Sequence, residues 1–164
     1  MSYTRFGAMI VTSTVAMFGL MYLNTYAADH IEFSQTRVWM ALIMGAAMAI
    51  IMIGFMFAMY PNRHANIAIV IGSAPVFGLS LWLVRSQATV YDEDYMKAMI
   101  PHHSIAIMTS ERAHIRDPRV RKLADGIIHT QVKEIGEMKR LIWQLQHHPT
   151  PANATDIPPY DPRR

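Results

Sequence analysis

Three long stretches without a charged side chain constrain this chain more than any other feature. They cover residues 6–28, 38–60 and 66–84. A helix needs about 20 mostly apolar residues to cross the roughly 30 Å hydrocarbon layer of a membrane, and each stretch is about that long. We therefore predict three transmembrane helices, in contact with membrane lipid, within a domain of residues 1–88.

The first stretch could be either a retained span or a cleaved secretory signal. Its apolar part is longer than the roughly 7–15 residues of a signal peptide's hydrophobic region. The sequence Tyr26-Ala27-Ala28 is also a poor cleavage site. We therefore predict that the stretch is retained as a span.

Charges in the two links between the stretches predict the orientation. The first link carries Asp29 and Glu32, whereas the second carries Arg63. Because arginine and lysine favour the cytoplasmic side of a membrane, we place the N-terminus and the second link in the cytoplasm. Residues 86–164 then lie on the opposite side. We predict a bacterial inner-membrane protein with a periplasmic C-terminal part.

The overall charge and the cysteine content exclude some partners and ligands. The formal net charge is only +3, and no run of Lys or Arg occurs, so nucleic acid is not an expected partner. The chain has no cysteine, which excludes a disulfide framework and thiolate metal ligands.

Two helix start signals divide the polar part of the chain. Asp92 is a candidate N-cap, and two more acidic residues follow it in the first turn, where the helix dipole favours anions. Asp117 precedes Pro118, which is a second start signal. We predict helices over residues 92–114 and 118–146.

These two helices predict an αα-hairpin in a domain of residues 89–148. The tail of residues 149–164 is rich in proline and has little to bury, so we predict that it is extended or disordered. A lone hairpin of about 55 residues cannot bury a full core. It must either pack on a second copy, giving a four-helix bundle in a homo-oligomer, most simply a dimer, or lie against the membrane domain.

Metal-ligand side chains interrupt the apolar face predicted for each helix. At about 100° per residue, the first helix places four such groups on one side: Met96, Met99, His102 and His103. The second helix places three on one side: Gln131, Glu134 and Met138. Leaving a buried polar group without a partner costs about 1–3 kcal/mol. Two alternatives remove this cost: a metal ion, or a hydrogen-bond network between the helices.

Pro101 lies directly before the two adjacent histidines. A proline inside a helix removes one backbone hydrogen bond and kinks the helix, whereas at a helix start it is tolerated. We predict one continuous, kinked helix through Pro101, and the alternative is a separate helix that begins at His102.

The ligand types favour copper. Thioethers are soft and imidazole is intermediate, so a His/Met set can hold both Cu(I) and Cu(II), and another divalent metal is the alternative. Four further residues are candidates for secondary metal binding. They are Met108, His114, His147 and His148.

Two segments of the polar part carry a family resemblance. The segments DEDYMKAMIPHHSIAIMTSERA and LADGIIHTQVKEIGEMKRLI resemble the domain of unknown function 305 family. The hallmark of this family is M-[IV]-P-H-H-x-x-A-[IV], followed by I-I-x-x-Q-x-x-E-I-x-x-M. The resemblance implies a helical bundle related to the ferritin-like group, and copper binding or tolerance in some members. The matching residues are Met99, His102, His103, Met108, Gln131, Glu134 and Met138. Ser104-Ile105 departs from the family, whose members often have more polar residues there.

Methionines also recur every four residues in the second stretch, at Met40, Met44, Met48, Met52 and Met56. One interpretation is a thioether ladder for Cu(I). The stronger one is ordinary helix packing, because methionine is an adaptable apolar residue. The small residues Gly45, Ala46, Ala49 and Gly54 also indicate a helix–helix interface.

The sequence gives no support for an enzyme. It lacks a phosphate loop, a nucleophile elbow and a zinc-protease motif. A metal-dependent oxidase would need several inward carboxylates, and only Glu134 faces the predicted seam. We expect a membrane-anchored, periplasm-facing protein that binds copper for sequestration, handling or tolerance, with other periplasmic copper proteins as candidate partners. The alternative is a structural, oligomer-forming module with a metal-free hydrogen-bond network.

Overall fold

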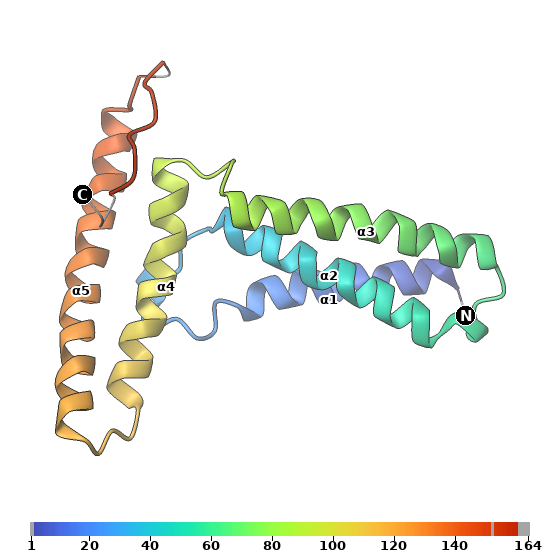
Figure 1. The fold of residues 1–164 in the computed structure, drawn as a ribbon, viewed down its shortest axis with the longest axis horizontal. Helices are drawn as coiled ribbons and strands as arrows, with labels where there is room; N and C mark the ends of the chain where they lie inside the picture. The colour runs from blue at the N-terminus through green and yellow to red at the C-terminus, as the bar shows by residue number, and fades with distance from the viewer. Residues whose placement is uncertain (1, 152, 161–164) are drawn as a thin grey trace.

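The computed structural model describes residues 2–151 and 153–160. Within these residues every regular element is helical, which confirms the prediction of an all-α chain. Three helices form a layer, and a hairpin of two helices runs across one end of it (Figure 1). The long helices are α1 Tyr3–Leu20, α2 Gln35–Phe55, α3 Arg63–Ser86, α4 Asp92–Arg112 and α5 Pro118–His147. Two short 3-10 helices, η1 Ala28–His30 and η2 Phe57–Met59, lie in the links.

Helix α2 packs against both α1 and α3 within the layer. Its buried small residues include Gly45, Ala46 and Ala49, which let the helix backbones approach closely. A Cβ atom at Gly45 would run into the side chain of Thr14 on α1. Gly54 is exposed and faces open space, so three of the four small residues predicted at an interface lie in one.

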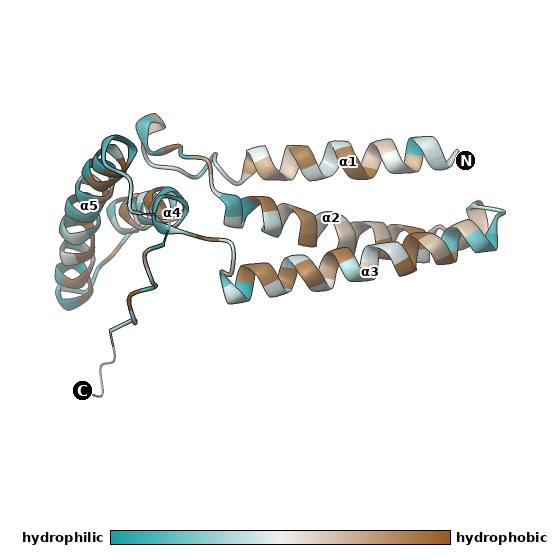
Figure 2. Cartoon of the chain, turned by 90° about the horizontal axis from the view of Figure 1, so that it is seen from above, coloured by the Kyte–Doolittle hydropathy of each residue, from teal (hydrophilic) through white to brown (hydrophobic). Residues whose placement is uncertain are grey.

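Helices α2 and α3 are long and apolar enough to cross a membrane. Apolar residues run along both helices in Figure 2, and large side chains such as Ile71, Leu79 and Trp82 of α3 are exposed. Helix α1 is shorter than the predicted span of residues 6–28. It ends at Leu20, and the chain then turns. Two helices of the layer, rather than three, therefore meet the requirements for a span.

The hairpin follows the predicted boundaries closely. Asp117 accepts a hydrogen bond from the Arg119 backbone N–H, and Pro118 opens α5, as predicted for an N-cap followed by proline. The N-cap of α4 is Tyr91, whose side chain makes no capping bond, and Asp92 is the first residue of the helix. The prediction that Asp92 is the N-cap is therefore wrong by one residue. Pro101 lies inside the continuous α4. The tail from residue 149 is exposed and without a helix where described, and residues 152 and 161–164 of the predicted tail lie outside the described part.

The hairpin packs on the layer through α4, which contacts α2 and η1. The link between α1 and α2 therefore lies at the hairpin end of the layer, and the link between α2 and α3 lies at the other end (Figure 1). The hairpin was expected either to pack on a second copy or to lie against the membrane domain. Within one chain it lies against the helical layer.

Candidate metal-binding groove

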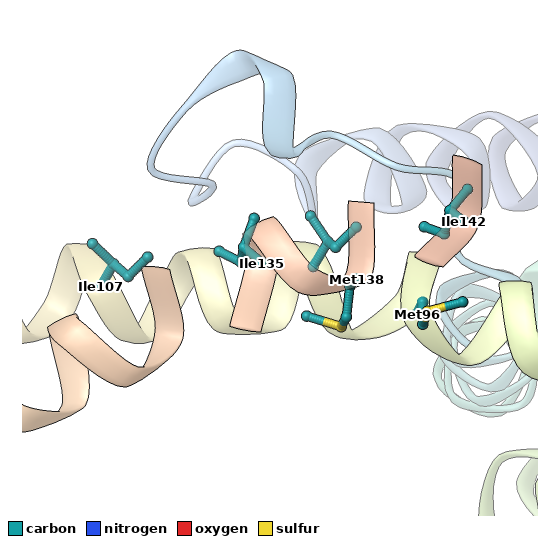
Figure 3. Close-up of a cluster of buried hydrophobic side chains, with 6 residues drawn as sticks. Met96, Ile107, Ile135, Met138 and Ile142 are labelled. Atoms are coloured by element: carbon teal, nitrogen blue, oxygen red, sulfur yellow. The ribbon is translucent and has the colours of Figure 1, made fainter. Parts of the chain in front are cut away.

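The two hairpin helices meet in a small apolar core. Figure 3 shows side chains from α4 and α5 converging on it. Its buried members are Met96, Ile100, Ile107, Ile135, Met138 and Ile142. Two of the predicted metal ligands, Met96 and Met138, are thus also core residues, and Met99 packs partly buried against them.

His103 lies in this core and is held by a carboxylate on the facing helix. It is buried, and its Nε2 atom lies 2.8 Å from Oε2 of Glu134. The same carboxylate oxygen accepts a weaker hydrogen bond from Nε2 of Gln131, at 3.4 Å. Three predicted residues thus form a chain of polar contacts between α4 and α5.

The contact with Glu134 also fixes which His103 nitrogen is free. An ionised carboxylate only accepts hydrogen bonds, so Nε2 of His103 donates its proton to Glu134. In a neutral ring the lone pair then lies on Nδ1, which is buried without a hydrogen-bond partner. Metal-binding histidines are commonly oriented in this way, with the second nitrogen donating to a carboxylate. The Glu134 contact therefore leaves Nδ1 as the His103 nitrogen available to a metal.

An open groove of about 590 Å³ runs along the hairpin beside His103. Predicted ligands that line it are Met96, Met99, His103, Glu134 and Met138. The structure therefore brings five of the seven primary candidates to one cavity. Gln131 does not line the groove, but it donates a hydrogen bond to Glu134, which does. The remaining lining residues include Asp92, Glu137 and Leu141.

His102 is placed differently from its neighbour. Its side chain is exposed and lines a second cavity, between α4 and the end of the layer, instead of the groove of His103. The two ring centroids are 6.4 Å apart. The prediction that both imidazoles face one seam is therefore wrong for His102.

The four secondary candidates lie away from the groove. Met108 is half-buried on α4, and His114 is exposed beyond the end of that helix. His147 stacks on Trp143, with ring centroids 4.2 Å apart, and its Nδ1 lies 2.7 Å from the carbonyl oxygen of Trp143. His148 is the exposed C-cap residue of α5. None of the four lines the groove.

The charged and imidazole groups alone do not form a metal site. Among residues 2–151 and 153–160, no three His, Asp or Glu side chains come close enough to hold an ion together. Zinc, calcium and magnesium sites rely on such groups when cysteine is absent. The groove of His103 is lined by three thioethers and three carboxylates: those of Met96, Met99 and Met138, and those of Asp92, Glu134 and Glu137. Thioethers bind soft ions such as Cu(I).

The sequence reasoning missed a second set of contacts, on another side of α4. Ser104 has no exposed surface. Its Oγ atom accepts a hydrogen bond from the Tyr26 backbone N–H at 2.8 Å and lies 3.0 Å from Nδ1 of His30. Lys139 of α5 adds an ion pair with Asp29 at 2.7 Å. These contacts hold the link of residues 21–34 on the hairpin. The unusual Ser104-Ile105 pair was the one sequence signal for them.

Two titratable groups of this link respond to their surroundings. Burial lowers the pKa of His30, an effect that Lys139 reinforces and Asp29 opposes. The hydrogen bond from Lys139 lowers the pKa of the Asp29 carboxyl. At neutral pH the docked link therefore carries a neutral imidazole and an ionised, paired carboxylate.

The fold and the groove define an all-α protein in which a histidine-containing helical hairpin is attached to a layer of apolar helices. Residues 83–156 match the model of the family described as domain of unknown function (DUF305). An uncharacterized protein of Acanthamoeba polyphaga mimivirus is 30% identical over 142 residues, which is 82% of this chain and 91% of that protein. The chain belongs to the DUF305 family. No solved structure matches it.

Proposed function

We propose that the protein is membrane-anchored and binds copper in the groove between α4 and α5. One observation carries the proposal: the groove places the buried, carboxylate-oriented His103 beside three thioethers, those of Met96, Met99 and Met138. A set of one imidazole and three thioethers suits Cu(I) better than a harder ion. Glu134 then orients His103, and the function is sequestration, handling or tolerance of copper.

Cu(I) titration of the full chain in detergent micelles tests this proposal. The titration is run without oxygen, against a competing chelator that reports free Cu(I) by its colour. Loss of a ligand in His103→Gln and loss of its orienting partner in Glu134→Leu, whose side chain cannot accept the His103 N–H, should each weaken binding about 10–100-fold, the range seen when the partner of a metal-binding histidine is removed. The matched control is His129→Gln, since His129 is exposed on α5. Equal affinity in His103→Gln and wild type contradicts the proposal.

A second candidate function follows from the contacts His103–Glu134 and Gln131–Glu134. In this alternative the polar network fixes the register of the two hairpin helices without a metal. Unchanged Cu(I) affinity in His103→Gln, together with lower helix stability in both His103→Gln and Glu134→Leu, supports this structural role.

We also propose that the hairpin faces the periplasm of a bacterial inner membrane, where other copper proteins are its candidate partners. Arg63 at the start of α3, away from the hairpin, supports this orientation, whereas Arg37 and Arg85 at the hairpin end oppose it. The chain has no cysteine, so single cysteines report each side. Thr155→Cys should react with an impermeant thiol reagent from outside, and Pro61→Cys only after the membrane is opened. Labelling of both from one side contradicts the orientation.

Self-association is the remaining part of the proposal. Helix α5 leaves several large apolar side chains exposed, of which Leu141 lies in the groove: Val120, Leu123, Val132, Leu141 and Trp143. Covering such a surface favours association, and two hairpins would complete a four-helix bundle. We expect a dimer in detergent by light scattering, converted to a monomer by charged replacements at Leu123 and Val132. A monomer at all concentrations contradicts this part.

A further inference from the structure

The adjacent residues His102 and His103 belong to different cavities. His103 lines the groove between α4 and α5, whereas His102 lines a cavity of about 400 Å³ where the hairpin meets the ends of α1 and α2. Met99 lines both. The second cavity is therefore a neighbour of the proposed copper groove, with one thioether residue between them.

The second cavity has its own set of soft donors. Met21 follows the last residue of α1, Met40 lies near the start of α2, and Met99 and His102 come from α4. Three separate parts of the chain thus place three methionines and one histidine around one space. Thioether and imidazole ligands without cysteine or carboxylate select a soft ion such as Cu(I) over zinc, calcium or magnesium.

A fixed positive charge beside this cavity further restricts the ion. Arg37 also lines it. The guanidinium donates a hydrogen bond to the Met21 carbonyl oxygen at 2.6 Å and lies 4.2 Å from the centre of the Tyr22 ring. Because Coulomb repulsion is proportional to charge, Arg37 repels a divalent ion twice as strongly as a monovalent ion at the same distance. The cavity therefore favours Cu(I) over Cu(II).

We propose that Met21, Met40, Met99 and His102 form a second site, for a soft monovalent cation, between the hairpin and the helical layer. The site rests on the proposed copper function of the first groove and extends it. Met99 lines both cavities, so its thioether serves one site at a time, and three other donors remain for the site without it. Met40 is also the first of the methionines spaced every four residues along α2, so the site lies at the start of that row.

Silver counting on the full chain in detergent micelles tests the second site, because Ag(I) has the charge and softness of Cu(I) without its redox chemistry. After equilibrium dialysis against Ag(I), wild type should retain two equivalents. The double variant Met21→Leu/Met40→Leu, which conserves side-chain volume, should retain one. The variant His103→Gln should also retain one, from the other site. The matched control Met9→Leu/Met59→Leu changes two exposed methionines outside both cavities and should retain two.

Each outcome separates the second site from the first. Two equivalents in Met21→Leu/Met40→Leu overturn the second site and leave the groove intact. A single wild-type equivalent that His103→Gln abolishes also overturns it. A single equivalent that persists in His103→Gln but is lost in Met21→Leu/Met40→Leu overturns the groove and keeps the second site. Because His102 is exposed, His102→Gln removes a donor without disturbing packing. It should lose the same equivalent as the double methionine variant, and retention of two equivalents in His102→Gln overturns the proposal.

Discussion

Replacing Ser104 with alanine removes one oxygen atom from the junction between the hairpin and the link of residues 21–34. That oxygen accepts the hydrogen bond of the Tyr26 backbone N–H and lies 3.0 Å from Nδ1 of His30. Ser104 thus accepts from Tyr26, and its hydroxyl also pairs with Nδ1 of His30, as donor or acceptor according to the tautomer of the ring. Alanine keeps the helix and leaves both partners on the link without their bonds.

The expected cost follows from these two lost partners. A buried donor or acceptor left unpaired costs about 1–3 kcal/mol. The link lies at the edge of the hairpin, where water can reach one of the two groups after a small movement, so we expect about 2 kcal/mol in total. Since each 1.4 kcal/mol is tenfold in an equilibrium constant, this corresponds to about a 30-fold rise in the population of the released link.

Amide hydrogen exchange of the full chain in detergent micelles measures this population. In Ser104→Ala the amide of Tyr26 should lose about 30-fold in protection, while amides of α2 and α3 keep theirs. The matched control is Thr109→Ala on the same helix, because the Thr109 hydroxyl bonds only to carbonyl groups of α4 itself. Wild-type protection of Tyr26 in Ser104→Ala, or an equal loss in Thr109→Ala, refutes the proposed role of Ser104.

Three further predictions concern the link, the hairpin core and the layer. Burial lowers the pKa of His30, so docking of the link is strongest above the free-histidine pKa of about 6.5 and weakens as the pH falls from there toward the lowered pKa. Amide hydrogen exchange of the link, corrected for the intrinsic effect of pH, should show this weakening in wild type and not in His30→Gln. Ile100 has no exposed surface, so Ile100→Ala should lower the free energy of unfolding by about 2–5 kcal/mol in urea titrations followed by circular dichroism, against less than about 0.5 kcal/mol for Lys133→Ala at an exposed position of α5. Gly45→Ala forces a Cβ atom into Thr14 and should cost about 1–3 kcal/mol, most of it recovered by adding Thr14→Ala; equal stability of Gly45→Ala and wild type contradicts the packing.

The hairpin was predictable because its signals are local. Asp117 and Pro118 mark the start of α5 by a capping bond and a fixed backbone angle, and both act there as expected. The facing positions of Met96 and Met138 follow from helical periodicity alone. Five residues of the groove, including His103, were accordingly predicted from the sequence. Which ring nitrogen of His103 has no hydrogen-bond partner was not predictable, because it depends on the contact with Glu134.

A helical wheel places the adjacent residues His102 and His103 about 100° apart, but the prediction put both on one seam because it allowed α4 a single buried face. The wheel assumes that one face of α4 is buried, but α4 is covered on one side by α5 and on another by the link and the end of α2. Ser104 has no place on an apolar seam, and it is nevertheless fully buried. Such burial is decided by long-range packing, which a local pattern does not contain.

The end of α1 is a second feature set by distant contacts. The apolar sequence continues to residue 28 without proline, so nothing local predicts an end at Leu20. In the structure Arg37 donates a hydrogen bond to the Met21 carbonyl oxygen, and the Tyr22 hydroxyl accepts one from the Ser34 backbone N–H. These contacts from the start of α2 hold the chain in a turn where a helix would otherwise continue.

The two sides of α4 lead to a last prediction about coupling. Met21 belongs to the region that Ser104 helps to dock, whereas His103 contacts only the facing side of the hairpin. Release of the link in Ser104→Ala should therefore weaken Ag(I) binding at the second site by at most the same factor, about 30-fold, and leave the groove of His103 unchanged. By thermodynamic linkage, saturating Ag(I) should restore part of the lost protection at Tyr26. Equal weakening at both sites would show that the hairpin as a whole had been disturbed, and it would refute the independence of the two sides.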